Sequence, residues 1–148
     1  MYIDALLRVS NAQAFTAVAV STDSIDLGNV TPRREIATGE AMGYGIAVNV
    51  AASATTVLVE LIMATDGALT AGIVVLSQRT FLAADMPVGR LIFMPLPQGV
   101  AAAGWLRFHG IRVTPVGGAA TVTLTAWLTT HSLFSIHAVH YADAITIS

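Results

Sequence analysis

Apolar and polar residues alternate with a period of two over most of the chain. The alternation runs through seven segments, at residues 15–20, 44–51, 56–64, 73–78, 91–94, 105–113 and 121–130. Successive side chains of an extended strand point to opposite faces, so this pattern predicts half-buried β-strands. Stretches rich in Gly, Pro, Asn and Asp separate the segments, and residues 3–14 fit a short helix. We therefore expect seven or eight short strands.

Short strands with turn residues between them, and no helices alternating with them, favour an all-β fold of two packed antiparallel sheets. Among such β-sandwiches, a jelly roll of about eight strands fits the number and spacing of the segments. One face of each strand would then fill the space between the sheets. This predicted core comprises Tyr44, Ile46, Val48, Val50, Val57, Val59, Leu61, Met63, Leu106, Phe108, Val122, Leu124, Ala126 and Leu128.

The opposite face of the last predicted strand carries threonines and a single tryptophan, namely Thr121, Thr123, Thr125, Trp127 and Thr129. Threonine suits a strand, and tryptophan combines a large apolar ring with one hydrogen-bond donor. This combination is typical of a surface that is in contact with a partner for part of the time. We predict that this face takes part in a contact.

The pattern divides the chain into a jelly-roll domain at residues 1–132 and an apolar C-terminal tail at residues 133–148. The large side chains of the tail are Leu133, Phe134, Ile136, Val139, Tyr141, Ile145 and Ile147. Removing these apolar side chains from water lowers the free energy of the protein. We expect it to pack either as an edge strand on its own subunit or along a neighbouring subunit by strand addition.

The composition also indicates a protein partner. Of the 148 residues, 55% are hydrophobic, and the mean hydropathy is +0.71, whereas ordinary domains contain ~45–50% apolar residues. Charged residues make up only 11% and the net charge is −2, which disfavours nucleic-acid binding. All seven basic residues are arginine, which protein interfaces enrich over lysine. A genome rich in Arg codons would explain this equally well.

Several other classes of protein are disfavoured. The chain has no cysteine, which excludes disulfides, thiolate metal sites and cysteine nucleophiles. Its first residues, MYIDALLRVS, lack the basic start and long apolar run of a secretion signal. Residues 114–142 carry no Asp, Glu, Lys or Arg, but their period-two alternation and the interruption by Pro115, Gly117 and Gly118 indicate a strand. We therefore expect no membrane-spanning segment.

Candidate catalytic and metal-binding groups lack the companions that such sites need. His131, His137 and His140 are close in sequence, but a gap of three places the last two on opposite faces of an extended chain. The His-x-His pair of cupin enzymes does not occur. Asp23 and Asp26 could form a glycosidase-type carboxylate pair, yet the surrounding STDSIDLG favours turn formation. We predict no catalytic residue, no cofactor and no metal, and therefore not an enzyme.

A cluster of charges, Arg33, Arg34 and Glu35, lies in the longest predicted loop. It is either a solvated group or a salt-bridging contact with a partner, because arginine can bind a carboxylate with two parallel hydrogen bonds. Together with the last strand and the tail, this loop gives a predicted interface composed of Arg33, Arg34, Trp127, Phe134, Ile136 and Tyr141.

The order of several features resembles the capsid cement proteins of certain tailed bacteriophages. These features are Asp4, Leu7, Ser10, Gln13, Ala14, the segment STDSIDLG, an arginine-containing loop that ends at Gly39 and Glu40, the pair Leu96 and Pro97, and WLRF at residues 105–108 before an alternating last strand. The resemblance covers about residues 4–130 and is most specific in the N-terminal third. The tail from Leu133 onward departs from the family pattern.

The resemblance implies a jelly-roll cement, or decoration, subunit on the outer surface of a phage head. Such a subunit is made in the bacterial cytoplasm, associates with itself, and clamps neighbouring major capsid proteins together without catalysing a reaction. We favour a dimer over a trimer. Two alternatives are a cupin-like enzyme and a receptor- or glycan-binding jelly roll of a phage particle. For the latter, Trp105 or Trp127 together with Tyr44 would supply an aromatic platform.

Overall fold

The computed structural model describes residues 5–29, 40–97 and 105–135. Within these residues the chain forms short strands, two 3-10 turns and a helical segment at residues 131–135. The turns are η1 (Ala5–Leu7) and η2 (Ala83–Asp85). The strands are β1 (Arg8–Phe15), β2 (Ala19–Val20), β3 (Ile25–Asp26), β4 (Met42–Val50), β5 (Thr56–Ala64), β6 (Val74–Leu82), β7 (Leu91–Pro95), β8 (Phe108–Val116) and β9 (Val122–Thr130).

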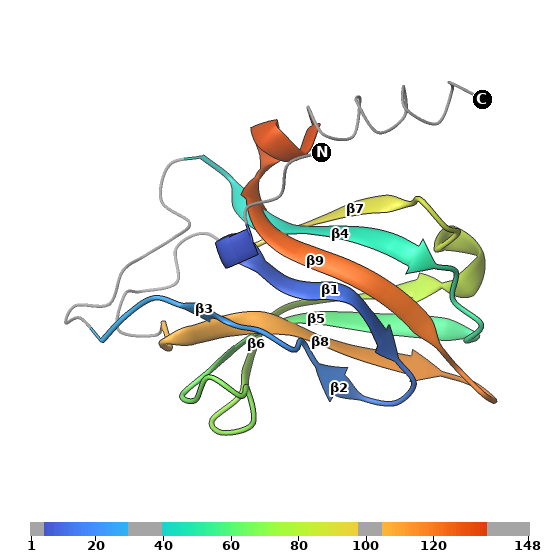
Figure 1. The fold of residues 1–148 in the computed structure, drawn as a ribbon, viewed down its shortest axis with the longest axis horizontal. Helices are drawn as coiled ribbons and strands as arrows, with labels where there is room; N and C mark the ends of the chain where they lie inside the picture. The colour runs from blue at the N-terminus through green and yellow to red at the C-terminus, as the bar shows by residue number, and fades with distance from the viewer. Residues whose placement is uncertain (1–4, 30–39, 98–104, 136–148) are drawn as a thin grey trace.

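These strands form two antiparallel sheets packed face to face (Figure 1). Sheet A has the order β1-β9-β4-β7, and sheet B has the order β2-β8-β5-β6, with β3 also paired to β8. Counting β2 and β3 as one interrupted strand gives two sheets of four strands. With this count, β5 and β6 are the only consecutive pair of described strands in the same sheet, and the other connections cross between sheets, as in a jelly roll. The predicted all-β antiparallel sandwich is confirmed.

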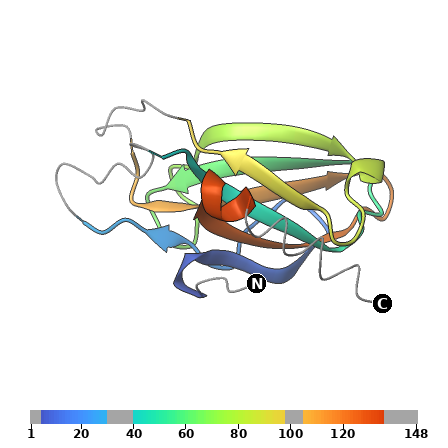
Figure 2. The ribbon, with the colours of Figure 1, turned by 90° about the horizontal axis from the view of Figure 1, so that it is seen from above.

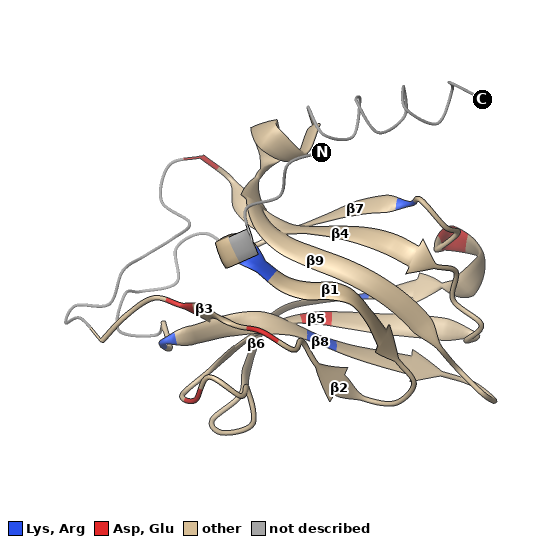
Figure 3. Cartoon of the chain, viewed as in Figure 1, with Lys and Arg blue, Asp and Glu red and all other residues tan. Residues whose placement is uncertain are grey.

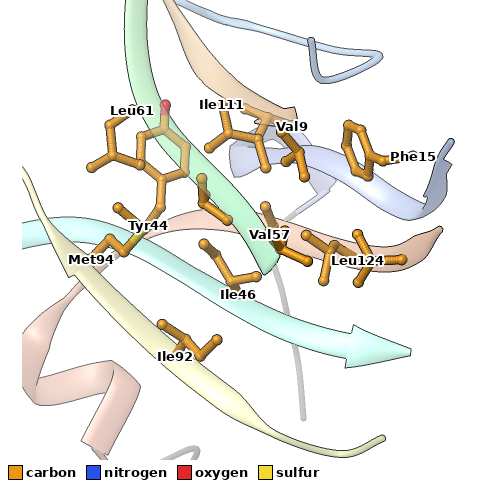
Figure 4. Close-up of a cluster of buried hydrophobic side chains, with 14 of the residues drawn as sticks. Val9, Phe15, Tyr44, Ile46, Val57, Leu61, Ile92, Met94, Ile111 and Leu124 are labelled. Carbon is orange, nitrogen blue, oxygen red and sulfur yellow. The ribbon is translucent and has the colours of Figure 1, made fainter. Parts of the chain in front are cut away.

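The hydrophobic core lies between the sheets, where inner-face side chains of β4, β7 and β9 meet those of β5 and β8 (Figure 4). Most residues of the predicted core are buried there, among them Tyr44, Ile46, Val57, Leu61 and Leu124. Val50 is an exception and is 54% exposed, because a register shift between Val48 and Val50 turns the end of β4 outward. Leu106 and Phe108 are only half-buried.

The N-terminal region differs from the prediction. The predicted helix at residues 3–14 is confined among the described residues to η1, and the first strand is β1 rather than residues 15–20. Two register shifts interrupt the pairing of β1 with β9. Ala12 lies within the second shift, between Ser10 and Gln13, with φ +46°, and its N–H donates to Thr125 Oγ1 at 2.9 Å. These bulges break the period of two, which explains why the alternation did not reveal the strand.

The limits of two further strands also differ from the prediction. β6 continues to Leu82 instead of ending at residue 78, and β8 begins at Phe108 rather than at residue 105. β6 is an edge strand with seven residues exposed or half-exposed in succession, from Val74 to Thr80. A strand that meets solvent on both faces has no reason to alternate, so its second half was not recognisable from the pattern.

Candidate functional site

Sheet A carries two glycines on the face that points away from sheet B. Gly43 and Gly45 alternate along β4 with the buried residues Tyr44 and Ile46. A Cβ atom at Gly45 would lie 2.6 Å from Cζ2 of Trp127, which is the residue directly opposite in β9. The bare backbone therefore leaves the space in which the indole ring lies against the outer face of the sheet.

An aromatic cluster, composed of Phe93, Trp127, His131 and Phe134, covers these glycines. The Phe93 ring lies 5.2 Å from His131 in an edge-to-face arrangement and 5.3 Å from Phe134, measured between ring centroids. The centroids of Trp127 and Phe134 are 6.5 Å apart. These separations fall within the favourable range for aromatic pairs. Phe134 thus joins β7 to β9 across the glycines of the intervening strand β4.

The side chain of Phe134 is held by a helical turn that starts directly after β9 (Figures 1 and 2). Thr130 occupies the N-cap position, since its Oγ1 accepts a hydrogen bond from the N–H of Leu133 at 3.3 Å. Ser135 Oγ donates to the carbonyl oxygen of His131 at 3.0 Å. The last residue of the strand therefore also fixes the direction in which the chain leaves the sheet.

Two residues directly before β4 provide a second anchor for this turn. The N–H of His131 donates to the carbonyl of Ala41 at 2.9 Å, and the N–H of Ser132 donates to Oε1 of Glu40 at 3.3 Å. Hydrogen bonds from Ser132 hold the pKa of Glu40 below its ordinary value. A carboxylate is favourable here because the N–H groups of a helical first turn attract negative charge. Glu40, which closes the loop in the resemblance, thus fastens the C-terminal segment.

In the monomer, Trp127 of the predicted contact face is covered by other residues of its own chain. Trp127 is 3% exposed, and Thr125 and Thr129 beside it are also buried. Period-two alternation did place Trp127 on the outer face, but Phe134 of the same chain lies against it there. A partner would touch Trp127 only after displacing Phe134.

Of the predicted tail, the structure describes residues 133–135, which belong to a helical segment at residues 131–135 and not to an edge strand. Phe134 is half-buried against its own sheet, while Leu133 beside it is 52% exposed. The other predicted interface residues, Arg33, Arg34, Ile136 and Tyr141, lie outside the described residues, as do His137 and His140.

The aromatic platform considered for glycan binding is not available on the surface. Trp105 is 1% exposed, and Tyr44 is fully buried within the core. Trp105 stacks on the buried imidazole of His109, with ring centroids 5.0 Å apart. These rings therefore pack in the interior of the sandwich.

Asp26 is engaged in an ion pair rather than in a carboxylate pair. Both of its oxygens accept hydrogen bonds from Arg107, each at 2.7 Å, and Oδ1 also accepts the N–H of Gly28 at 2.8 Å. The Arg107 guanidinium and the Gly28 N–H lower the pKa of Asp26 to about 2. Gly28 has φ +82°, so the turn predicted around Asp26 is present. The backbone N–H of Asp23 donates to the carbonyl of Val9.

Groups that could hold a metal or cofactor do not come together in the part of the chain that the structure describes. No cluster of three His, Asp or Glu side chains occurs there, and His131 instead contacts Phe93. Among the same residues, no helix has the length and apolar character required to cross a bilayer.

The sequence analysis missed Phe93, which belongs to the aromatic cluster, and the role of Gly43 and Gly45, which lie beneath it. Gly43 and Gly45 alternate with core residues, and two glycines at one strand face indicate close approach by another group. That signal was present in MGYG, although it did not reveal which ring would occupy the space.

Comparison with known proteins gives one family. A family model described as Bbp16 matches residues 9–128, whereas no match was found among curated proteins. The matched stretch starts in β1 and ends within β9, so it contains both sheets of the sandwich. Because the match covers most of the chain, this protein belongs to the Bbp16 family.

Proposed function

We propose that this protein is a capsid cement protein, which binds the outer surface of a phage head and clamps neighbouring major capsid proteins together. The observation that carries the proposal is that three ranges of residues nearly coincide. The resemblance to cement proteins covers about residues 4–130, the Bbp16 match covers residues 9–128, and the jelly-roll sandwich ends with β9 at Thr130. The same β-sandwich therefore underlies both the resemblance to cement proteins and the match to the Bbp16 family.

The proposed mechanism depends on buried area rather than on chemistry. Several large apolar side chains project from the sandwich into solvent, including Val18, Val50, Leu82, Val88 and Val116, each more than half exposed. Burial of apolar surface contributes ~25 cal/mol per Å², and a typical specific contact buries about 800 Å² on each partner. Repetition of such contacts around a shell increases the total resistance to rupture without any single contact being strong.

The proposal includes self-association, with a dimer favoured over a trimer, and a location on the outer capsid surface of the virion after synthesis in the host cytoplasm. A clamp between two capsid proteins needs at least two binding surfaces, and a dimer supplies two identical copies of each. In this account the protein needs no cofactor and catalyses no reaction.

Binding to heads that lack the protein tests the proposal. Purified protein is mixed with such heads and sedimented, and the occupancy and the temperature of head disruption are measured. We expect saturable binding at a fixed number of copies per capsid protein and a higher disruption temperature. Heads of an unrelated phage serve as the control. Failure to bind its own heads at micromolar concentration would contradict the proposal.

Two truncations test the role of the C-terminal segment in this binding. Deletion of residues 136–148 retains the helical turn and Phe134, whereas deletion of residues 131–148 also uncovers Trp127. If Ile136 and Tyr141 form part of the interface, the shorter deletion lowers occupancy without lowering the melting temperature. Unchanged occupancy and oligomeric state would remove these residues from the interface.

A further inference from the structure

The two sheets leave a cavity at one open side of the sandwich. The edge strand β6 of sheet B and the edge strand β7 of sheet A lie on the same side (Figure 2). A cavity of about 350 Å³ opens between them, and η2 contributes to its wall. Its lining residues are Arg79, Thr80, Phe81, Asp85, Arg90, Leu91, Ile92 and Phe93.

The charge of this cavity is positive. Two arginines and one aspartate line it, on a molecule whose charged residues are sparse and scattered (Figure 3). In the described parts of the chain, the ion pairs are those of Arg107 with Asp26 and of Arg112 with Glu60. No described carboxylate pairs in this way with Arg79 or Arg90, so these two side chains retain donors for a carboxylate from outside.

Arg79 is also held in position. Its guanidinium carbon lies 4.8 Å from the centroid of the Phe81 ring, in a cation–π contact between residues on the same face of β6. The plane of the guanidinium can rest on an aromatic ring while its N–H groups point to a carboxylate. An arginine arranged in this way loses less side-chain entropy when a partner binds.

The edge of β6 beside the cavity is open. β6 pairs with β5 along one side, and no strand within the described residues pairs along the other. From Ser77 to Leu82 the pairing with β5 runs without a register shift. Val74, Val75 and Leu82 are exposed. Edge strands of this length usually carry protective charges or prolines, whereas Arg79 is the only charged residue in VVLSQRTFL.

We propose that β6 accepts an extended segment of the capsid protein as an additional strand, and that an acidic side chain of this segment binds Arg79 and Arg90 in the cavity. This inference rests on the proposed function and names the surface and the chemistry of the contact. Added strands gain affinity from main-chain hydrogen bonds and specificity from side-chain pockets. A second copy of β6 does not fit, because it would bring another arginine and no carboxylate to the edge.

The experiment compares binding to capsid heads for the wild type, for the double variant Arg79→Gln/Arg90→Gln, and for Arg8→Gln. Arg8 lies in β1, outside the cavity, and controls for the loss of a positive charge. Equal melting temperatures verify that all three proteins are folded. We expect wild-type binding to weaken as salt is raised and the double variant to bind roughly tenfold more weakly or worse, with a smaller salt dependence. Arg8→Gln should bind as the wild type does.

Amide hydrogen exchange on the wild type provides a second readout that requires no substitution. We expect the amides of residues 74–82 to exchange more slowly on heads than in free protein, because strand addition satisfies the open edge. Binding of the wild type with unchanged exchange in β6, or equal binding by the double variant, would overturn this inference and leave the proposed function intact. Absence of wild-type binding would overturn both.

Discussion

The buried imidazole of His109 makes a sharp prediction about stability in mild acid. His109 is fully buried on β8 and stacks on Trp105. Its Nε2 lies 3.0 Å from the carbonyl oxygen of Leu106, which requires the proton to be on that nitrogen. Its Nδ1 is buried and has no hydrogen-bond partner among the described residues. Protonation would therefore place a charge in the interior and add an N–H with no acceptor.

Burial lowers the pKa of His109 from 6.5 to about 4. Since the folded pKa is the lower one, the unfolded chain binds more protons between these two values, and stability falls as the pH falls through this window. The stability that the neutral imidazole contributes is fully present only well above pH 6.5. For these two pKa values, linkage gives a loss of about 1.3 kcal/mol between pH 7.5 and pH 5.5, and about 2 kcal/mol by pH 5.

Urea unfolding followed by circular dichroism at pH 7.5, 6.5, 5.5 and 5 measures this loss. The range ends at pH 5 because the lowered pKa values of Asp26 and Glu40 add their own losses below their ordinary values of 3.8 and 4.5. The variant His109→Phe should lose most of the pH dependence, whatever its absolute stability. If His109→Phe showed the wild-type slope, the assignment to His109 would be refuted.

Three further predictions concern the core and the aromatic cluster. Gly45→Ala places a methyl group against the buried indole of Trp127 and should lower the free energy of unfolding, measured with urea, by about 1–3 kcal/mol. An unchanged urea midpoint would show that the indole ring can move away without cost. Tyr44→Phe removes a buried hydroxyl that has no hydrogen-bond partner among the described residues. The free energy of unfolding should therefore stay the same or rise by about 1 kcal/mol. A clear decrease would contradict the absence of a hydrogen bond to this hydroxyl. Phe134→Ala should increase acrylamide quenching of the tryptophan fluorescence by uncovering Trp127 while Trp105 stays buried, whereas Leu133→Ala, at an exposed position, should leave the quenching unchanged. Equal quenching in both variants would contradict the contact between Phe134 and Trp127.

The fold class was predictable because the central strands have distinct inner and outer faces. β5 was predicted at its observed limits, and β9 to within one residue, since one face of each fills the core and alternation follows directly. β1 was not predictable in this way, because register shifts between Arg8 and Ser10 and between Ser10 and Gln13 interrupt the pattern. β6 was predicted only in part, because it meets solvent on both sides.

The candidate sites depend on contacts that the local pattern does not contain. Alternation assigns Trp127 to the outer face, but its burial depends on Phe134 in a different element and on the space at Gly45. Likewise, Asp26 and Arg107 are 81 residues apart in the chain and meet because β3 pairs with β8. Such partners follow from sheet topology, which the turn and strand signals of one sequence do not specify.

The position of β9 has a consequence for biosynthesis. β9 is the last of the described strands, yet in sheet A it separates β1 from β4. During translation, β1 has no neighbour in its sheet until residues 122–130 have left the ribosome, and the closure of so long a loop is slow. Chains terminated before residue 122 would leave β1 unpaired and one edge of β4 open, and open edges promote aggregation. The sandwich can therefore assemble correctly only after residues 122–130 have been synthesised.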